Sequence, residues 1–110
     1  MNPKEVYQSF TEAGNQLAEA KFAYYQLHEQ TKSLLASLTM AAKDIDGIKS
    51  MAEAKEIGLA SSVYRKHLYT VADHHKAYLY AESQYKAIDR LFEAQRTMES
   101  TNRAAMRSAT

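Results

Sequence analysis

Two adjacent histidines, His74 and His75, follow Asp73 and offer the chain's most concentrated metal-ligating side chains. Because neighbouring residues of a helix point about 100° apart, the two imidazoles cannot bind one ion together. His67 and His74 share a helix face but lie two turns, roughly 10 Å, apart, and the chain has no H-E-x-x-H or E-x-x-H motif. We therefore expect no metal or other cofactor. Polar residues in a helix seam fix register instead, and histidines there can make assembly sensitive to pH.

Motifs of known catalytic sites are also missing from the sequence. There is no glycine-rich phosphate loop and no G-x-S-x-G, and the absence of cysteine excludes a thiolate nucleophile or ligand. Asp44 and Asp46 precede Gly47 without the spacing of an EF-hand. The sequence thus predicts a protein that is not an enzyme.

Aromatic rings alternate with cations on one helical face of the second half of the chain. This face comprises Arg65, Tyr69, Ala72, Lys76, Tyr80, Ser83, Ala87 and Arg90. Tyrosine and arginine are typical of binding hot spots on proteins, and interleaved rings and cations also suit stacking on bases with contacts to phosphates. A dimer interface or a solvated face is the third interpretation.

Arginines continue toward the C-terminus. Arg96, Arg103 and Arg107 follow Arg90, and Glu93 stands three residues before Arg96, where the two can pair. Cations near the end of a helix interact favourably with its dipole, while a basic tail could instead reach phosphates. The predicted partner-binding residues are Arg65, Tyr69, Lys76, Tyr80, Arg90 and Arg96.

Composition limits the classes of protein and of partner. Of 110 residues, 45% are hydrophobic and 25% charged, with three Gly, one Pro and a net charge of +1. So few helix breakers disfavour a β fold, and so small a charge gives no general attraction to nucleic acid. Without cysteine, a signal-like start or an apolar run near the roughly 20 residues of a membrane span, we expect a cytoplasmic protein with no membrane partner.

The elements that position these side chains follow from a repeat of alternating four- and three-residue steps. The apolar or small positions are Val6, Phe10, Ala13, Leu17, Ala20, Tyr24, Leu27, Thr31, Leu34, Leu38, Ala41, Ile45 and Ile48, with Thr31 the one polar member. A 3.5-residue repeat keeps one helix stripe against one partner. Asn2, Pro3 and Glu5 form a capping box at its start, so we predict a helix over 3–42.

Further helices follow a predicted stop at Lys43–Gly47. Ser50-Met51-Ala52-Glu53 is a second capping box that opens a short helix over 51–57, and Gly58 with Ser61 and Ser62 allows a bend. A last helix is expected over 62–101, with a frayed tail over 102–110. Its seam is Tyr64, His67, Val71, His74, Tyr78, Ala81, Tyr85, Ile88, Phe92 and Gln95, flanked by Leu68, Leu79 and Leu91.

The predicted fold is therefore all-α: a long, coiled-coil-like antiparallel helical hairpin with a short helix in the connection, forming a single domain over 1–110. Two helices bury one apolar stripe and leave the residues that flank it exposed to solvent. We therefore expect a homo-oligomer, most simply a dimer that forms a helical bundle. The predicted oligomer core is Phe10, Leu17, Tyr24, Leu27, Leu34, Val71, His74, Tyr78, Tyr85 and Phe92.

Three segments of the second half of the chain form a recognisable pattern: Tyr64-Arg65-Lys66-His67-Leu68, Ala87-Ile88-Asp89-Arg90, and the run from Glu93 through Arg96-Thr97-Met98 to Ala104. In these segments residues 62–104 resemble small all-helical accessory proteins of bacteriophages, of the kind encoded among early or recombination genes. The resemblance implies a viral protein that binds a component of a bacterial host, either in single-strand DNA transactions or by blocking a defence system such as a CRISPR effector. It implies no active-site residues.

Three functions follow as hypotheses. The first is a non-enzymatic protein-binding module, in the phage case an inhibitor of a host defence complex, and the small net charge favours it. The second is a nucleic-acid-binding accessory protein in recombination, which would use the tyrosine–arginine face and the C-terminal arginines. The third is a scaffold that binds only to itself.

Overall fold

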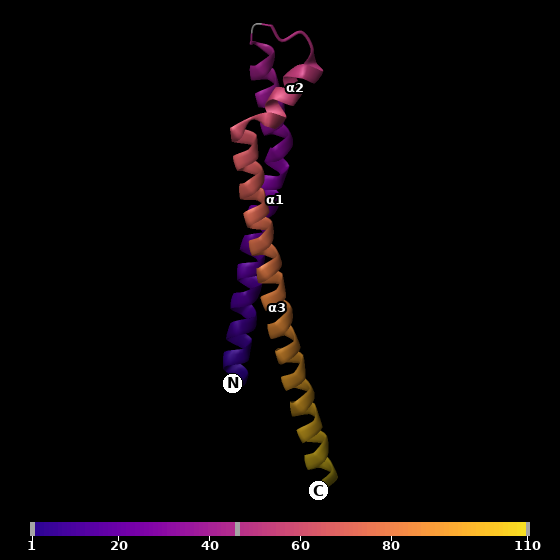
Figure 1. Cartoon of the computed structure of the whole chain (residues 1–110). Coiled ribbons are helices and arrows are strands. Elements are labelled where there is room, and N and C mark those ends of the chain that lie inside the picture. Colours follow the sequence, from indigo (N-terminus) through magenta and orange to yellow (C-terminus); the bar gives the residue numbers. More distant parts are fainter. Residues whose placement is uncertain (1, 46, 110) are drawn as a thin grey trace. The chain divides into compact units, whose positions relative to one another are not determined.

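The computed structural model describes residues 2–45 and 47–109 of the chain, and Figure 1 shows its three helices. They are α1 (Pro3–Lys43), α2 (Met51–Ala60) and α3 (Ser62–Ala109), and no strand occurs among the described residues. The all-α class and the antiparallel pairing of α1 with α3, with α2 in their connection, confirm the predicted helical hairpin. None of these helices combines the length and the apolar character needed to cross a membrane.

Contacts divide the chain into two compact units. Unit 1 comprises Met1–Ala20 and Tyr78–Thr110, and unit 2 comprises Lys21–Ala77. Each unit contains a segment of α1 and a segment of α3.

In unit 1, aromatic rings join the two helices. The Phe10 ring of α1 lies 5.2 Å from the Tyr85 ring and 5.3 Å from the Phe92 ring of α3, centroid to centroid. Val6 and Ala13, one turn to either side of Phe10, are buried. Val6 borders a hollow with Leu91 and Met98, while Gly14 lies beside Tyr85. Residue numbers therefore rise along α1 as they fall along α3, and the segments are antiparallel.

In unit 2, polar side chains contribute to the seam. The Tyr24 ring stacks on the His75 ring at 4.7 Å, and Oγ1 of Thr31 lies 2.9 Å from Nε2 of His67. The polar member of the α1 stripe thus meets a polar member of the α3 seam. As in unit 1, the pairing is antiparallel.

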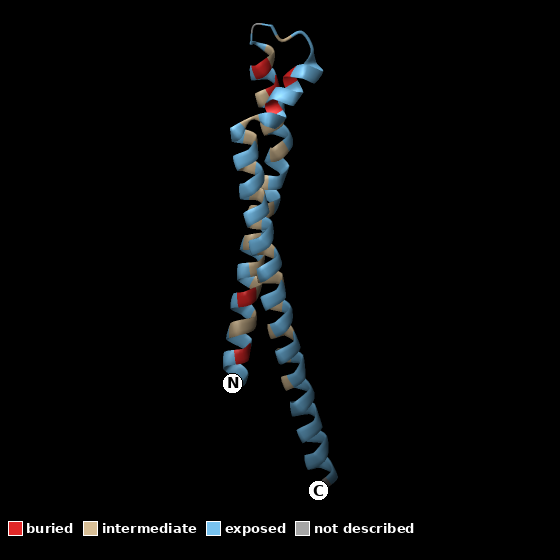
Figure 2. Ribbon diagram, in the orientation of Figure 1, coloured by how far each residue is buried: buried red, intermediate tan, exposed pale blue. Residues whose placement is uncertain are grey.

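The seam is half-buried along its length. All ten predicted seam residues of α3, from Tyr64 to Gln95, are intermediate in exposure, as are Leu17, Tyr24, Leu27 and Leu34 of α1. Among described residues the buried hydrophobic side chains are only Val6, Ala13, Ala42 and Ala54, and Figure 2 shows how few positions are covered. Two helices supply too little surface to enclose a side chain on all sides.

The α1 stripe changes face after Leu38. Ala41 and Ile45, which the repeat assigned to the stripe, are exposed, whereas Thr39 and Ala42 are buried. The cause is α2, which packs on a neighbouring face of α1 in unit 2. Gly58 is buried there, close to the Thr39 backbone, and α2 runs on to Ala60. The predicted end at 57, with Gly58 in a bend, was wrong, and the glycine serves close helix contact instead.

The predicted capping box at Asn2 has both of its hydrogen bonds, whereas at Ser50 the Glu53 carboxylate accepts from Lys49 N–H (3.4 Å). Glu5 N–H donates to Oδ1 of Asn2 (2.9 Å), and Asn2 N–H donates to Oε2 of Glu5 (3.3 Å). At α2, Glu53 N–H donates to Oγ of Ser50 (3.1 Å). The α1 helix ends at Lys43, and Gly47 has a φ of 90°, which a glycine adopts without strain; Asp46 lies outside the described residues.

The end of α3 also differs from the prediction. The sequence placed the end of the helix at 101 and a frayed tail beyond it, whereas α3 continues to Ala109. Ala104, Ala105, Met106 and Arg107 are good helix formers. Every side chain from Arg96 to Ser108 is exposed, so within unit 1 this segment is helical without being covered.

Candidate protein-binding surfaces

The predicted partner-binding residues of unit 2 are exposed on α3. Arg65, Tyr69 and Lys76 all face solvent, and 71% of Tyr69 is accessible. A tyrosine so exposed on a helix presents a large apolar ring to any partner that approaches. The structure therefore leaves these three side chains available for binding.

The predicted residues of unit 1 are exposed as well, and one of them makes contacts within the chain. Tyr80 is 68% accessible, and Arg90 is exposed. The Arg96 guanidinium carbon lies 5.9 Å from the Phe92 ring centre, and its Nη1 lies 3.9 Å from Oε1 of Glu93. The predicted Glu93–Arg96 pair is thus present, although an ion pair this exposed adds little stability. Arg65, Tyr69 and Lys76 belong to unit 2, and Tyr80, Arg90 and Arg96 belong to unit 1.

The histidines make contacts within unit 2. Nδ1 of His74 lies 2.9 Å from the Thr70 carbonyl, to which it donates. The Tyr24 ring contacts two imidazoles, with its centroid 5.7 Å from His28 and 4.7 Å from His75. The sequence prediction overlooked His28, although its i,i+4 spacing from Tyr24 was the available signal. In the described part of the chain, no three His, Asp or Glu side chains gather as a metal site would require.

The predicted oligomer core lies on the seam within the chain. Phe10, Tyr85 and Phe92 contact one another in unit 1, and Tyr24 contacts His75 in unit 2. All ten predicted core residues are half-buried, so part of each remains accessible. Their role in assembly with a second copy stays a prediction.

A groove between α1 and α2 in unit 2 was not foreseen from the sequence. Its volume is about 550 Å³, and its apolar lining is Leu35, Ala36, Met40 and Met51, beside Thr39. Lys32 and Lys55 complete the lining, and none of the acidic side chains that the structure describes borders it. Met40 and Met51 are 57% and 51% exposed. We call this site the α1–α2 groove.

The position of α2 explains why the groove could not be predicted. The repeat assigned Leu34 and Leu38 to the seam and left Leu35, Ala36 and Met40 without a role. These residues line a groove only because α2 folds back against this part of α1. The two helices approach so closely that a Cβ added to Gly58 would lie 3.4 Å from the Thr39 nitrogen. The spacing of Lys32, Ala36 and Met40 at steps of four was the one local sign of a shared face.

Comparison of the chain with protein-family models, with curated proteins and with solved structures finds no match.

Proposed function

We propose that this protein is a non-enzymatic helical binding module whose α1–α2 groove receives an amphipathic helix of a partner protein. The observation that carries the proposal is the groove itself, about 550 Å³ and lined by leucine, alanine and methionine. Apolar grooves between helices bind the apolar face of a partner helix through residues at i, i+3 or i+4, and i+7. Methionine suits such a site because its flexible thioether adapts to different side chains.

The charges around the groove indicate the partner's chemistry. Lys32 and Lys55 are both exposed and border the apolar lining from α1 and α2. Acidic residues flanking the apolar face of a partner helix would meet these ammonium groups. Electrostatic complementarity of this kind mainly selects the partner and speeds association. The proposed partner is thus a helix with an apolar face and acidic edges.

The test uses two designed helical peptides that share one leucine face. One carries glutamate and the other lysine at the positions that flank this face, and binding to the full chain is measured by fluorescence anisotropy. We expect the glutamate peptide to bind at least tenfold more tightly than the lysine peptide, and this preference should shrink as salt is added. Equal affinity for both peptides, or binding of neither, would overturn the proposal.

Matched variants locate the binding. Ala36→Glu places a carboxylate in the groove and should lower the affinity for the glutamate peptide by tenfold or more. Ser37→Glu adds the same charge at an exposed position outside the lining and should leave the affinity unchanged. The double variant Lys32→Glu/Lys55→Glu should reverse the preference toward the lysine peptide.

The nucleic-acid hypothesis is decided with a labelled single-stranded DNA of about 20 nucleotides. Binding that falls steeply with salt and is lost in Arg65→Glu/Lys76→Glu, while Ala36→Glu binds normally, would replace the proposed function with DNA binding. The resemblance to phage accessory proteins adds the hypothesis that the partner is a host protein, such as a component of a defence complex.

A further inference from the structure

A second heptad stripe runs along the unit 1 segment of α3, beside the seam. Its members follow steps of four and three: Tyr80, Gln84, Ala87, Leu91, Ala94, Met98, Thr101 and Ala105. The first five each precede a seam residue by one position, so the stripe is turned about 100° from the seam. All eight residues are exposed, and none is charged. We call this set the α3 stripe.

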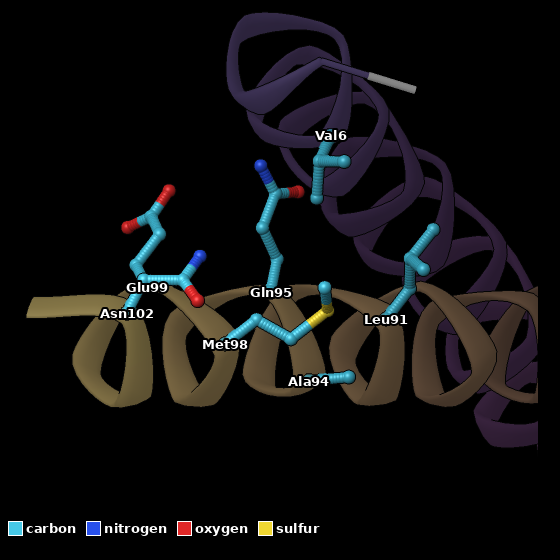
Figure 3. A pocket seen from close by; sticks show the side chains of 7 residues that line it. All are labelled: Val6, Leu91, Ala94, Gln95, Met98, Glu99 and Asn102. Atoms are coloured by element: carbon cyan, nitrogen blue, oxygen red, sulfur yellow. The ribbon is translucent and has the colours of Figure 1, made fainter. Parts of the chain in front are cut away.

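The α3 stripe borders two hollows in the surface of unit 1. Leu91, Ala94 and Met98 line one of about 360 Å³, which Val6 of α1 also borders (Figure 3). Tyr80 and Gln84 line another of about 280 Å³. Leu91 is 45% and Met98 65% exposed, so apolar surface on this face lacks cover within the chain.

The order of large and small side chains along the α3 stripe is complementary to the same stripe of a second copy that runs in the opposite direction. When two copies of one helix pair antiparallel, residue numbers rise along one copy and fall along the other. The numbers of any two residues that face each other therefore add up to the same total. With a sum of 185, Tyr80 faces Ala105, Ala87 faces Met98, and Leu91 faces Ala94 of the other copy. Each large residue meets an alanine, so layers can interdigitate without voids.

The polar members obey the same register. Gln84 faces Thr101 of the other copy, so the amide and the hydroxyl meet each other rather than an apolar side chain. The charged residues next to the stripe are Lys86, Arg90, Glu93 and Glu99. In this register Arg90 lies near Thr97 of the other copy, not near a second cation.

The single chain exposes more surface than a compact protein of its mass. The chain exposes 8408 Å², whereas a compact protein of this mass exposes roughly 6,100 Å². A standard interface removes about 800 Å² from each partner. Moreover, the exposed segment beyond Gln95 is about as long as the shortest helices that hold together in water by themselves.

We propose that the α3 stripe is a homodimerisation surface, on which the α3 segment of a second copy binds antiparallel, with the two-fold axis passing between Phe92 and Glu93. This contact lies in unit 1 and is independent of the α1–α2 groove in unit 2. The partner of this surface is a second copy of the chain, in a defined register.

The register can be tested by disulfide cross-linking, because the chain contains no cysteine. Ala87→Cys and Met98→Cys are prepared separately, then mixed and oxidised. We expect a covalent dimer in the mixture only, because residues 87 and 98 face each other across the two-fold axis. In either variant alone the identical cysteines lie about 16 Å apart along the helix direction, too far for a disulfide.

A second measurement uses mass in solution by light scattering or sedimentation. Ala94→Glu places a charge in the stripe and should convert the dimer to monomer, whereas Ser100→Glu, an exposed position off the stripe, should remain dimeric. Circular dichroism shows whether both variants stay helical. Cross-linking of like with like would indicate parallel pairing and overturn the proposal, as would a wild-type monomer at tens of micromolar or a dimer that persists in Ala94→Glu.

Discussion

The hydroxyl of Thr31 on α1 lies 2.9 Å from Nε2 of His67 on α3, and it also donates toward the Leu27 carbonyl at 3.4 Å. With its proton directed to that carbonyl, Oγ1 can accept the Nε2–H of His67. Thr31 is the polar member of the α1 stripe, and His67 is a polar member of the α3 seam. The pair therefore satisfies both side chains in one register of the two helices, and slipping either helix would leave them unpaired.

Replacing Thr31 by valine should lower the free energy of unfolding by about 1 kcal/mol, because the half-buried imidazole of His67 loses its partner. The double variant Thr31→Val/His67→Leu should recover most of this loss, since both groups then become apolar. Urea unfolding of the two single variants and the double variant measures the coupling between the residues.

Thr70→Val is the control for that cycle. Its hydroxyl donates to the Lys66 carbonyl of the same helix, 3.0 Å away, and is exposed, so the change should stay within about 0.5 kcal/mol. A coupling energy near zero between Thr31 and His67 would show that the contact does not hold the register.

Phe10→Ala should destabilise the protein by about 2 kcal/mol. The ring contacts Tyr85 and Phe92 in unit 1 but is only half-buried, so the loss should fall below that of a fully buried phenylalanine. Phe22→Ala removes the same ring where it is 69% exposed and should cost less than about 0.5 kcal/mol. Thermal unfolding at one fixed protein concentration compares the two; equal losses would contradict the seam assignment.

The heptad repeat was enough to predict the hairpin and its seam, because a 3.5-residue period has one structural solution in a pair of helices. Asn2–Glu5 and Ser50–Glu53 were predictable since a capping box needs only residues within one turn. The prediction failed where a third element intervenes. Thr39 is buried where Gly58 of α2 packs on it, and no sequence feature within α1 indicates where α2 will fold back.

The binding surfaces show the same limit. Arg65, Tyr69 and Tyr80 were assigned to a helical face off the seam, and in the structure they are exposed. The α1–α2 groove was missed because Leu35 and Met40 lie outside the repeat and become a binding surface only beside Met51. The helical repeat is thus enough to identify side chains that lie off the seam. A groove cannot be identified in this way, because it depends on how segments distant in sequence pack together.

Gly14 and Gly58 should respond differently to alanine. At Gly14 a Cβ would lie 3.5 Å from Cε2 of Tyr85, an ordinary contact, so Gly14→Ala should stabilise the protein by about 0.5–1 kcal/mol through helix propensity. At Gly58 a Cβ would lie 3.4 Å from each of three atoms, including the Thr39 nitrogen. In Gly58→Ala, this tight contact should offset the stability gained from the higher helix propensity of alanine.

The larger substitution Gly58→Leu extends that comparison. It should force α2 from α1, cost about 1–3 kcal/mol, and raise amide exchange in α2. Thermal unfolding and hydrogen exchange measure both effects. If Gly58→Leu were as stable as the wild type, with α2 equally protected, the close approach of α2 to α1 would be wrong.

The last part of α3 should be ordered by assembly. Every side chain from Arg96 to Ser108 is exposed in the single chain, and an uncovered helical segment of this length is only marginally stable in water. In the dimer, Met98, Thr101 and Ala105 would be covered by the second copy. Amides of residues 99–108 should therefore exchange at least tenfold more slowly in the wild type at high concentration than in the monomeric Ala94→Glu variant. Amides near Thr31, in unit 2, should exchange alike in both proteins and serve as the internal control. Equal exchange of residues 99–108 in the two proteins would mean that this segment is not covered on assembly and that the contact lies elsewhere.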